Sequence, residues 1–311
     1  MRTTFINTLI ERARIDKRIF LLTPDLGFSV FEKFIELYPD RYLNIGIAEQ
    51  NAIGIAAGLA LSGYKVYVYS IIPFLTMRCF EQVRIDVAYM NLDVKLIGVG
   101  SGYSYGPAGA THHAIEDISI MRSLPNMAVC CPGDPLEAKQ LIEQSFSLPG
   151  PMYIRLGKNN EPFIHAKDDL VKFGEASILK RGNDFALITT GNMLEQGKSW
   201  VNSWISEGYD PEFISMHTIK PIDKKVVLSI IERGLNIITL EEHSVIGGLG
   251  SAVSDIVASA GSSCKVAKVG IPDIFSHYVG SQEAHRKRYG LASRPDLHVL
   301  GYNEPEKLSH I

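Results

Sequence analysis

The 311-residue sequence is poor in cysteine, with only Cys79, Cys130, Cys131 and Cys264, and none of these forms a CxxC pair. Structural zinc sites and disulfide frameworks need recurring cysteine spacings, so both are excluded and a reducing compartment is the natural environment. The chain also lacks a basic surplus, because 31 Lys and Arg face 34 Asp and Glu. Binding to nucleic-acid phosphates needs such a surplus, and we expect no nucleic-acid partner.

Long hydrophobic runs are absent too. The longest apolar stretch, 52–61, is rich in Ala and Gly and falls well short of the ~20 residues that span a bilayer. Charges such as Glu11, Arg12 and Asp16 interrupt the N-terminal segment, and no small-residue cleavage site follows a continuous apolar run. We therefore expect a cytoplasmic protein with neither a signal peptide nor a membrane partner.

No glycine motif typical of a phosphate-binding loop is present. The sequences GVGSG at 98–102 and GGLG at 247–250 lack the GxGxxG spacing and the lysine of GxxxxGK[ST]. Turn geometry explains these glycines more simply, since Gly supplies positive φ and close packing. Nucleotide binding by this chain alone is not expected.

What the sequence does contain is an alternation of short apolar runs with helical patterns. The first series of expected strands is 18–23, 65–70, 94–100, 127–133 and 152–157, and the second is 184–191, 211–219, 236–244 and 265–272. Such alternation predicts parallel sheets with helices on both faces. We predict an α/β protein of two doubly wound domains in series, at 1–160 and 177–311, joined by a linker at 161–176 where mixed charges and a proline replace any period.

Ligands on such sheets bind at the carboxyl ends of the strands, where Glu49 begins an otherwise apolar helix in the sequence IGIAEQN. One interpretation is a first-turn carboxylate stabilised by the helix dipole, worth ~0.3–1 kcal/mol. The other is an acid in an apolar wall that shares a proton with a ligand nitrogen. Phe74, Met77 and Phe80 leave a similar choice, because their i, i+3, i+6 spacing fits a core face or a cofactor pocket.

Longer motifs in a fixed order resemble a known family. They are 41–70, 73–100, 109–138, 151–158 and 240–253. Together they are similar to the C-terminal half of transketolase over about 24–290, and most similar to the separate C-terminal subunit of split transketolases. The resemblance extends more distantly to 1-deoxyxylulose-5-phosphate synthase and to the beta subunit of 2-oxo-acid dehydrogenases. It implies a thiamine diphosphate-binding pyrimidine-type domain followed by a transketolase C-terminal domain.

This resemblance assigns roles to particular residues. Glu49 matches the catalytic glutamate that hydrogen-bonds the aminopyrimidine of thiamine diphosphate, and His112 matches a histidine close to that ring and to the donor sugar. The remaining cofactor-binding matches are Asp25, Phe74, Met77 and Phe80, and the substrate-binding matches are Ser29, His112 and Arg155. Arg155 and Ser29 would bind the sugar phosphate, although Arg155 alone also fits a solvated charge at a strand end.

Two further residues match the family without a defined role. Arg78 matches an arginine common in split subunits. His113 stands where the family has glutamine.

Departures from the family pattern carry information about partners and substrate. The chain has no GDG motif, the module that binds Mg²⁺ and the diphosphate, so the resemblance implies an N-terminal partner subunit that carries it, in a dimer of heterodimers. A family acid that binds a substrate hydroxyl is Ala108 here, and a histidine near the acceptor phosphate is Gly100. We expect these changes to leave room for a modified sugar in place of the usual sugar phosphate.

The expected function is therefore the C-terminal subunit of a two-component, thiamine diphosphate-dependent transketolase, which moves a two-carbon ketol unit between sugars. The alternatives are a 2-oxo-acid dehydrogenase beta subunit, an acyloin-forming enzyme like 1-deoxyxylulose-5-phosphate synthase, and a non-catalytic assembly subunit.

Overall fold

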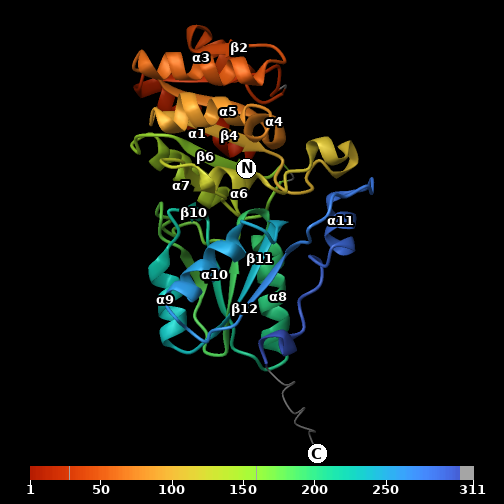
Figure 1. Ribbon diagram of the computed structural model, residues 1–311. Helices are drawn as coiled ribbons and strands as arrows, with labels where there is room; N and C mark the ends of the chain where they lie inside the picture. Colours follow the sequence, from red (N-terminus) through yellow and green to blue (C-terminus); the bar gives the residue numbers. More distant parts are fainter. Residues whose placement is uncertain (28, 159, 302–311) are drawn as a thin grey trace, which may run out of the picture.

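The computed structural model describes residues 1–27, 29–158 and 160–301, which form two α/β domains stacked end to end (Figure 1). The strands of the N-terminal domain are β1 Ile19–Thr23, β2 Tyr42–Asn44, β3 Lys65–Ile71, β4 Val94–Val99, β5 Ala128–Cys130 and β6 Met152–Leu156. Its helices are α1 Arg2–Ile15, α2 Glu32–Leu37, η1 Pro39–Arg41, α3 Glu49–Leu61, α4 Ile72–Thr76, α5 Phe80–Gln82, the π-helix η2 Val83–Tyr89, η3 Gly106–Ala108, η4 Ala110–His112, α6 Asp117–Ser123 and α7 Pro135–Ser145.

The C-terminal domain continues the alternation. Its strands are β7 Ser177–Lys180, β8 Phe185–Thr189, β9 Glu212–Ser215, β10 Thr218–Lys220, β11 Asn236–Ser244 and β12 Val266–Ile271. Its helices are η5 Gly191–Met193, α8 Leu194–Ser206, α9 Lys224–Glu232, α10 Leu249–Ser259, α11 Gln282–Arg288 and η6 Leu297–Leu300. Within the described ranges, no helix is long and apolar enough to cross a membrane.

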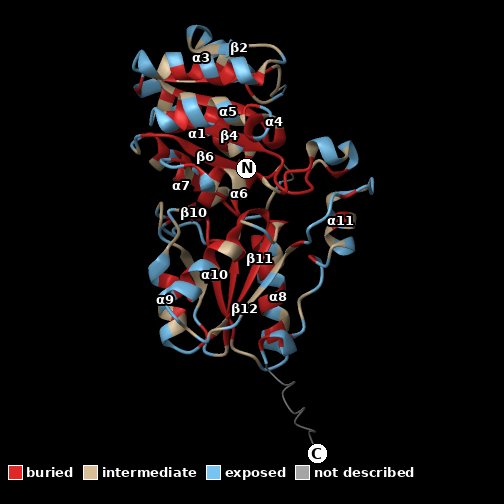
Figure 2. Cartoon of the chain, in the orientation of Figure 1, coloured by how far each residue is buried: buried red, intermediate tan, exposed pale blue. Residues whose placement is uncertain are grey.

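The two sheets confirm the α/β prediction. The first has the order β10-β5-β6-β4-β3-β1-β2 and the second β12-β11-β8-β9-β7. All neighbouring strands are parallel except the edge strands β10 and β7, which run antiparallel to β5 and β9. The central strands of both sheets are buried and the outer helix faces exposed (Figure 2), whereas the edge strands β2, β7 and β12 are only partly buried.

One predicted strand is wrong in detail. The apolar run 211–219 divides into β9 and β10, and β10 crosses to pair with β5 of the other domain. The Cys131 amide donates to the carbonyl of His217 between these two strands, at 2.7 Å. A run of apolar residues predicts burial but not which sheet each half joins. The limits 1–160 and 177–311 therefore stay a prediction, since the sheets do not divide at one point of the chain.

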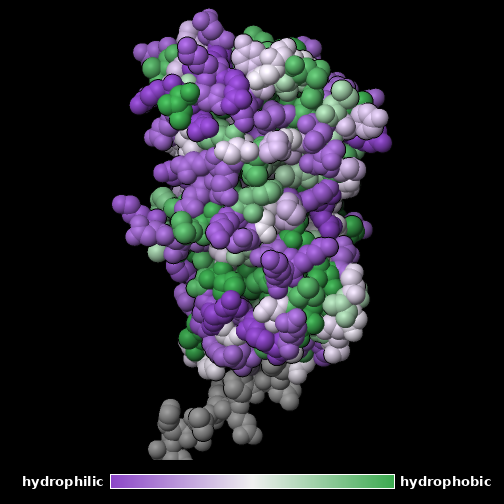
Figure 3. Space-filling model, turned by 90° about the vertical axis from the view of Figure 1, so that its left-hand side faces the viewer, coloured by the Kyte–Doolittle hydropathy of each residue, from purple (hydrophilic) through white to green (hydrophobic). Residues whose placement is uncertain are grey.

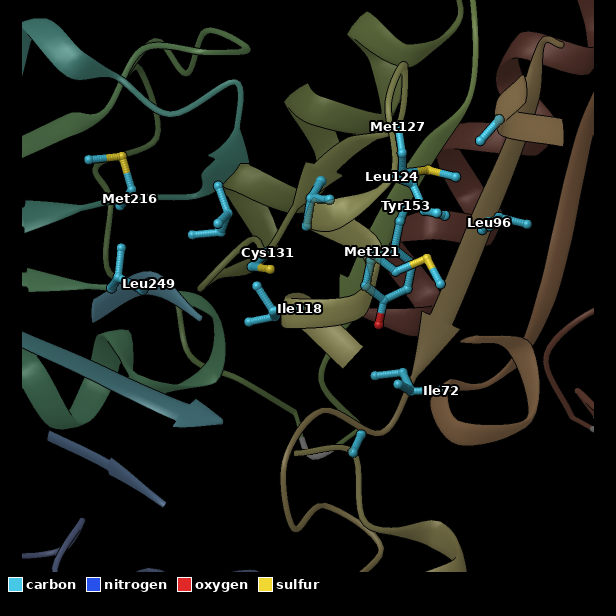
Figure 4. Close-up of a cluster of buried hydrophobic side chains, with 14 of the residues drawn as sticks. Ile72, Leu96, Ile118, Met121, Leu124, Met127, Cys131, Tyr153, Met216 and Leu249 are labelled. Atoms are coloured by element: carbon cyan, nitrogen blue, oxygen red, sulfur yellow. The ribbon is translucent and has the colours of Figure 1, made fainter. Parts of the chain in front are cut away.

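A continuous apolar core joins the domains. Cys131, Met216 and Leu249 lie at the junction, between the two sheets, in the cluster that also contains Leu96 and Met121 (Figure 4). On the other face of the N-terminal sheet, α1, α2 and α7 bury a second cluster. Elsewhere the surface is mixed, with apolar patches separated by polar side chains on the side of the molecule where α9 lies (Figure 3).

Candidate active site

Glu49 is the first residue of α3, and only 4% of its surface is exposed. Its Oε2 accepts a hydrogen bond from Nη1 of Arg78 at 2.8 Å. Within the described part of the chain, its other oxygen, Oε1, has no hydrogen-bond partner. The structure thus favours an acid in an apolar wall over a solvated first-turn carboxylate.

Arg78 can reach Glu49 because helix α4 ends just before it. The amides of Met77 and Arg78 both donate to the carbonyl of Pro73, at 3.0 and 3.2 Å, which ends α4 before α5 begins at Phe80. The guanidinium carbon of Arg78 lies 4.1 Å from the centroid of the Phe74 ring. A planar cation therefore stacks on an aromatic face and binds a buried carboxylate at the same time.

His112 lies on the other side of Phe74. It ends η4, and its ring meets Phe74 edge to face with centroids 5.1 Å apart. Its Nδ1 is 2.9 Å from the hydroxyl of Thr111. Burial, together with the positive charge of Arg78, lowers the pKa of His112 and so favours the uncharged ring. The structure brings Glu49 and His112 to one place through Arg78 and Phe74.

Met77 and Phe80 do not continue a single helix face with Phe74. Met77 ends α4 with 38% of its surface exposed, whereas Phe80 starts α5 and packs against the core cluster that contains Leu22 and Ala52. The i, i+3, i+6 spacing does not correspond to one continuous helix, because α4 ends at Thr76 and α5 begins at Phe80. Contact of Met77 and Phe80 with a cofactor stays a prediction.

Asp25 and Ser29 lie in the loop after β1, at the same sheet edge. Asp25 has a φ of 52° and exchanges two hydrogen bonds with the Asn44 side chain, of 3.0 and 3.1 Å. Ser29 is exposed with a φ of 61°, and its amide donates to Oε1 of Glu32 at 2.6 Å. The loop holds both residues in left-handed backbone geometry, and their predicted roles stay predictions.

Arg155 lies away from any open surface, with 1% exposed. Its Nε donates to Asp117 at 2.8 Å, and its Nη2 donates to the carbonyls of Ala114 and Glu242 at 2.8 and 3.0 Å. Burial alone would lower its pKa, but the adjacent Asp117 carboxylate raises it. The idea of a solvated charge at a strand end is wrong, and this placement gives no support to the predicted phosphate contact.

Lys158, which the sequence analysis missed, lies where Arg155 was expected to act. It follows the end of β6, is half-buried, and its Nζ lies 4.1 Å from the Tyr105 ring centroid. Burial and the nearby charge of Arg2 lower the pKa of Lys158. Its place just beyond a parallel strand is the signal that could have identified it.

Gly100 does not leave the expected space. It has a φ of 94°, and a Cβ atom there would lie 2.2 Å from Cε2 of Tyr105. The Tyr105 ring fills the space that a side chain at position 100 would need, so the prediction of room for a larger sugar at this point is wrong. Ala108 is exposed at the end of η3 and places no ring or acid there.

His113 has a different environment from His112. It is 4% exposed, and its ring lies edge to face with Tyr103, at a centroid distance of 4.8 Å. Tyr103 in turn stacks on His285 of α11, at 4.4 Å. Figure 1 shows α11 beside the loop that carries η3 and η4. His113 therefore attaches this loop to the C-terminal domain.

Comparison with known proteins gives two family matches. Residues 1–162 match the pyrimidine binding domain of transketolase, and residues 174–294 match the transketolase C-terminal domain. This chain belongs to the transketolase family. It corresponds to the C-terminal-half subunit of split transketolases, as the resemblance predicted.

Individual transketolase relatives agree over most of the chain. An apulose-4-phosphate transketolase subunit of Actinobacillus succinogenes is 36% identical over 258 residues, which cover 83% of each protein. A 6-deoxy-6-sulfo-D-fructose transketolase subunit of Clostridium sp. is 35% identical over 297 residues, 94% of this chain and 91% of the relative. A solved split-gene transketolase, described as an inactive β4 tetramer, has a TM-score of 0.86 and 34% identity, with 93% of each chain covered.

Transketolases use thiamine diphosphate, and the geometry at Glu49 fits its aminopyrimidine half. The Glu49 carboxylate is 4% exposed and keeps one oxygen without a protein partner in the described residues, which leaves a position where a ring nitrogen of the cofactor can donate. The half-buried Phe74 beside it offers an aromatic wall. Over residues 1–27, 29–158 and 160–301, no three His, Cys, Asp or Glu side chains gather in a way that could hold a metal ion.

Proposed function

We propose that this transketolase subunit binds the aminopyrimidine of thiamine diphosphate at Glu49 and Phe74 and catalyses ketol transfer with an N-terminal partner subunit. The contact series from Glu49 through Arg78 and Phe74 to His112 carries the proposal. It gathers an acid, an aromatic wall and a histidine of lowered pKa at the carboxyl edge of the N-terminal sheet. Asp25, Met77 and Phe80 would complete the protein wall around the cofactor.

When bound, thiamine diphosphate supplies the nucleophilic carbon that takes up a two-carbon unit from a ketose. The free oxygen of Glu49 would hydrogen-bond a ring nitrogen of the cofactor and could pass a proton to it and take it back. His112, with its lowered pKa, accepts a proton from a substrate hydroxyl and returns it when the product leaves. Proton transfer at two separate atoms is the contribution of this chain.

The substrate is proposed to be a sugar with a terminal anionic group. Lys158 carries a charge beside Tyr105 at the same sheet edge as Ser29, and it makes no ion pair with a carboxylate in the described residues. Two relatives bear names of substrates with a phosphate or a sulfo group. The absence of an acid at Ala108 supports a modified sugar, because the hydroxyl that such an acid would bind has no partner there.

The partner is proposed to supply the rest of the cofactor site. A GDG-containing N-terminal subunit would bind Mg²⁺ and the diphosphate, in a dimer of heterodimers. The inactive β4 assembly named for a split-gene relative supports this division of labour. The relatives named above are transketolase subunits, which favours ketol transfer over a 2-oxo-acid dehydrogenase or a purely structural subunit.

Reconstitution tests the proposal. The purified chain with thiamine diphosphate and Mg²⁺ should transfer no ketol unit, and adding the N-terminal subunit should restore turnover with phosphorylated or sulfonated ketoses. An Ala108→Asp variant of the complex should shift the preference toward ordinary sugar phosphates. Full activity of the chain alone, or an inactive complex that binds no cofactor, would contradict the proposed function.

A further inference from the structure

Arg78 links three members of the site: Glu49, Phe74 and His112. Its guanidinium binds Oε2 of Glu49 at 2.8 Å and lies 4.1 Å from the Phe74 ring centroid. Its charge also contributes to the lowered pKa of His112. No role follows from the sequence for this arginine.

The contacts of Arg78 are unlike those of an arginine that only stabilises the fold. Its side chain is 44% exposed, while its partner Glu49 is 4% exposed. Within the described residues, Glu49 is the one hydrogen-bond partner of the Arg78 guanidinium. A buried carboxylate thus depends on a cation that is itself open to solvent on one side.

We propose that Arg78 is a positioning residue that fixes the carboxylate of Glu49 for the cofactor, by holding Oε2 and thereby setting the direction of Oε1. This inference rests on the proposed function. It concerns the residue that orients the acid, not the acid itself.

The physical argument concerns the freedom of the Glu49 carboxylate. A charge-assisted hydrogen bond from Nη1 of Arg78 fixes the position of Oε2 and restricts the rotation of the carboxylate. Stacking on Phe74 restricts the guanidinium in turn, so the plane of the ring and the plane of the carboxylate are linked through one group. Without Arg78 the carboxylate could rotate, and its free oxygen would face a ring nitrogen only part of the time.

The same bond serves the proton transfer. When Glu49 gives its proton to a ring nitrogen, the O–H bond breaks, an N–H bond forms, and the electron pair stays on the Glu49 oxygen. The carboxylate so produced is buried, and Arg78 supplies the positive charge that stabilises it. When the proton returns, the N–H bond breaks, the O–H bond forms again, and the carboxyl group and the ring nitrogen are both neutral, while Arg78 keeps its charge.

Cofactor binding at equilibrium tests the proposal without reference to turnover. Calorimetric titration of the reconstituted complex with thiamine diphosphate and Mg²⁺ should show affinity about tenfold weaker for Arg78→Met, with part of the loss recovered by Arg78→Lys. In a Glu49→Gln background the same Arg78→Met change should have little further effect. That non-additivity is the signature of action through Glu49, which a purely structural role would not produce.

Arg84, an exposed arginine in η2, provides the matched control. Arg84→Met should leave affinity and assembly unchanged, with assembly followed by size-exclusion chromatography. Equal losses for Arg78→Met in the native and Glu49→Gln backgrounds would overturn the proposal. Tighter binding by Arg78→Met would also overturn it, because Arg78 would then compete with the cofactor.

A second measurement separates this inference from the proposed function. Urea unfolding of the chain alone, for native, Arg78→Met, Glu49→Gln and the double variant, needs no cofactor. The Arg78–Glu49 pair predicts coupled effects on the unfolding midpoint, whereas additive effects contradict it. Coupling here, combined with a complex that binds no thiamine diphosphate, would disprove the proposed function and leave the pair intact.

Discussion

Two arginine–carboxylate pairs in this subunit have the same length and opposite surroundings. Arg78–Glu49 and Arg155–Asp117 both measure 2.8 Å. Arg155 and Asp117 are 1% and 0% exposed, and Arg155 also binds backbone carbonyls on both domains. Arg78 is 44% exposed, and its partner keeps one unpartnered oxygen. The sealed pair, Arg155–Asp117, has all its partners within the chain. The open pair, Arg78–Glu49, leaves a hydrogen-bonding position for a ligand.

The largest expected effect comes from replacing Glu49, the acid of the open pair. In the reconstituted complex, Glu49→Gln should slow exchange of the thiazolium proton by about 10² to 10⁴-fold, the usual contribution of a general acid–base group. NMR measurement of that exchange provides the test. The subunit should fold and assemble normally, and an unchanged exchange rate would show that the open pair is only structural.

Breaking the sealed pair should affect the fold and not the chemistry. Asp117→Ala leaves Arg155 as an unpaired buried charge, and we expect the free energy of unfolding to fall by about 3–5 kcal/mol. Urea unfolding measures this change. Asp255→Ala, which removes an exposed partner of Arg122, serves as the control and should cost less than about 1 kcal/mol. Similar losses for the two variants would mean that the domain junction does not seal Arg155.

Lys158 provides a further test on the partly exposed side of the site, where an anionic substrate group would bind. Lys158→Met should raise KM for a phosphorylated or sulfonated sugar roughly tenfold or more, because a charged hydrogen bond is worth about 1.5–3 kcal/mol. Uncharged sugars should show no change. Lys139→Met, at an exposed position on α7, is the matched control. Equal KM increases for charged and uncharged sugars would argue against an anion contact.

Asp134, another buried carboxylate, should have a smaller effect on the free energy of unfolding, and that effect depends on pH. Burial alone would raise the pKa of Asp134, but hydrogen bonds from the His165 ring and from backbone amides outweigh it and lower the pKa to about 2. Because protonation is easier in the unfolded chain, the carboxylate stabilises the fold above about pH 4, and this contribution disappears as pH falls toward 2. It amounts to about 2 kcal/mol.

Asp134→Asn should remove that acid dependence, since an amide does not titrate in this range. Urea unfolding between pH 2 and 5 compares the slopes of the native subunit and the variant. Parallel slopes would show that other carboxylates cause the acid sensitivity. The amide of Glu137 donates to Oδ1 of Asp134 at the start of α7, and asparagine can accept the same bond, so the helix cap should be kept in the variant.

The sequence predicted the open pair only in part. Glu49 was identified because its motif and its position before an apolar helix are local features. The contact with Arg78 depends on the break between α4 and α5, where two amides share the Pro73 carbonyl. A helical period read through 74–80 contains no sign of that break, so the sequence did not show that Phe74 and Phe80 lie on separate helices.

The burial of Arg155 in the sealed pair could not be predicted from the sequence, for a different reason. Arg155 and Lys158 are cations three residues apart at one strand end, and both suit a phosphate. Which of them is buried depends on where the second domain packs, and the carbonyl of Glu242 that covers Arg155 is 87 residues away in sequence. The α/β alternation follows from short apolar runs, whereas the division of 211–219 between two sheets depends on the same packing.

The position of β10 has a consequence for synthesis on the ribosome. The N-terminal sheet ends at β5 until residues 218–220 have left the exit tunnel, because β10 is the strand that pairs with that edge. During this interval the nascent chain presents an unpaired strand edge, which attracts other strands. Chaperone contact with nascent chains should therefore persist until about the point where β10 emerges, well after the N-terminal domain has been translated.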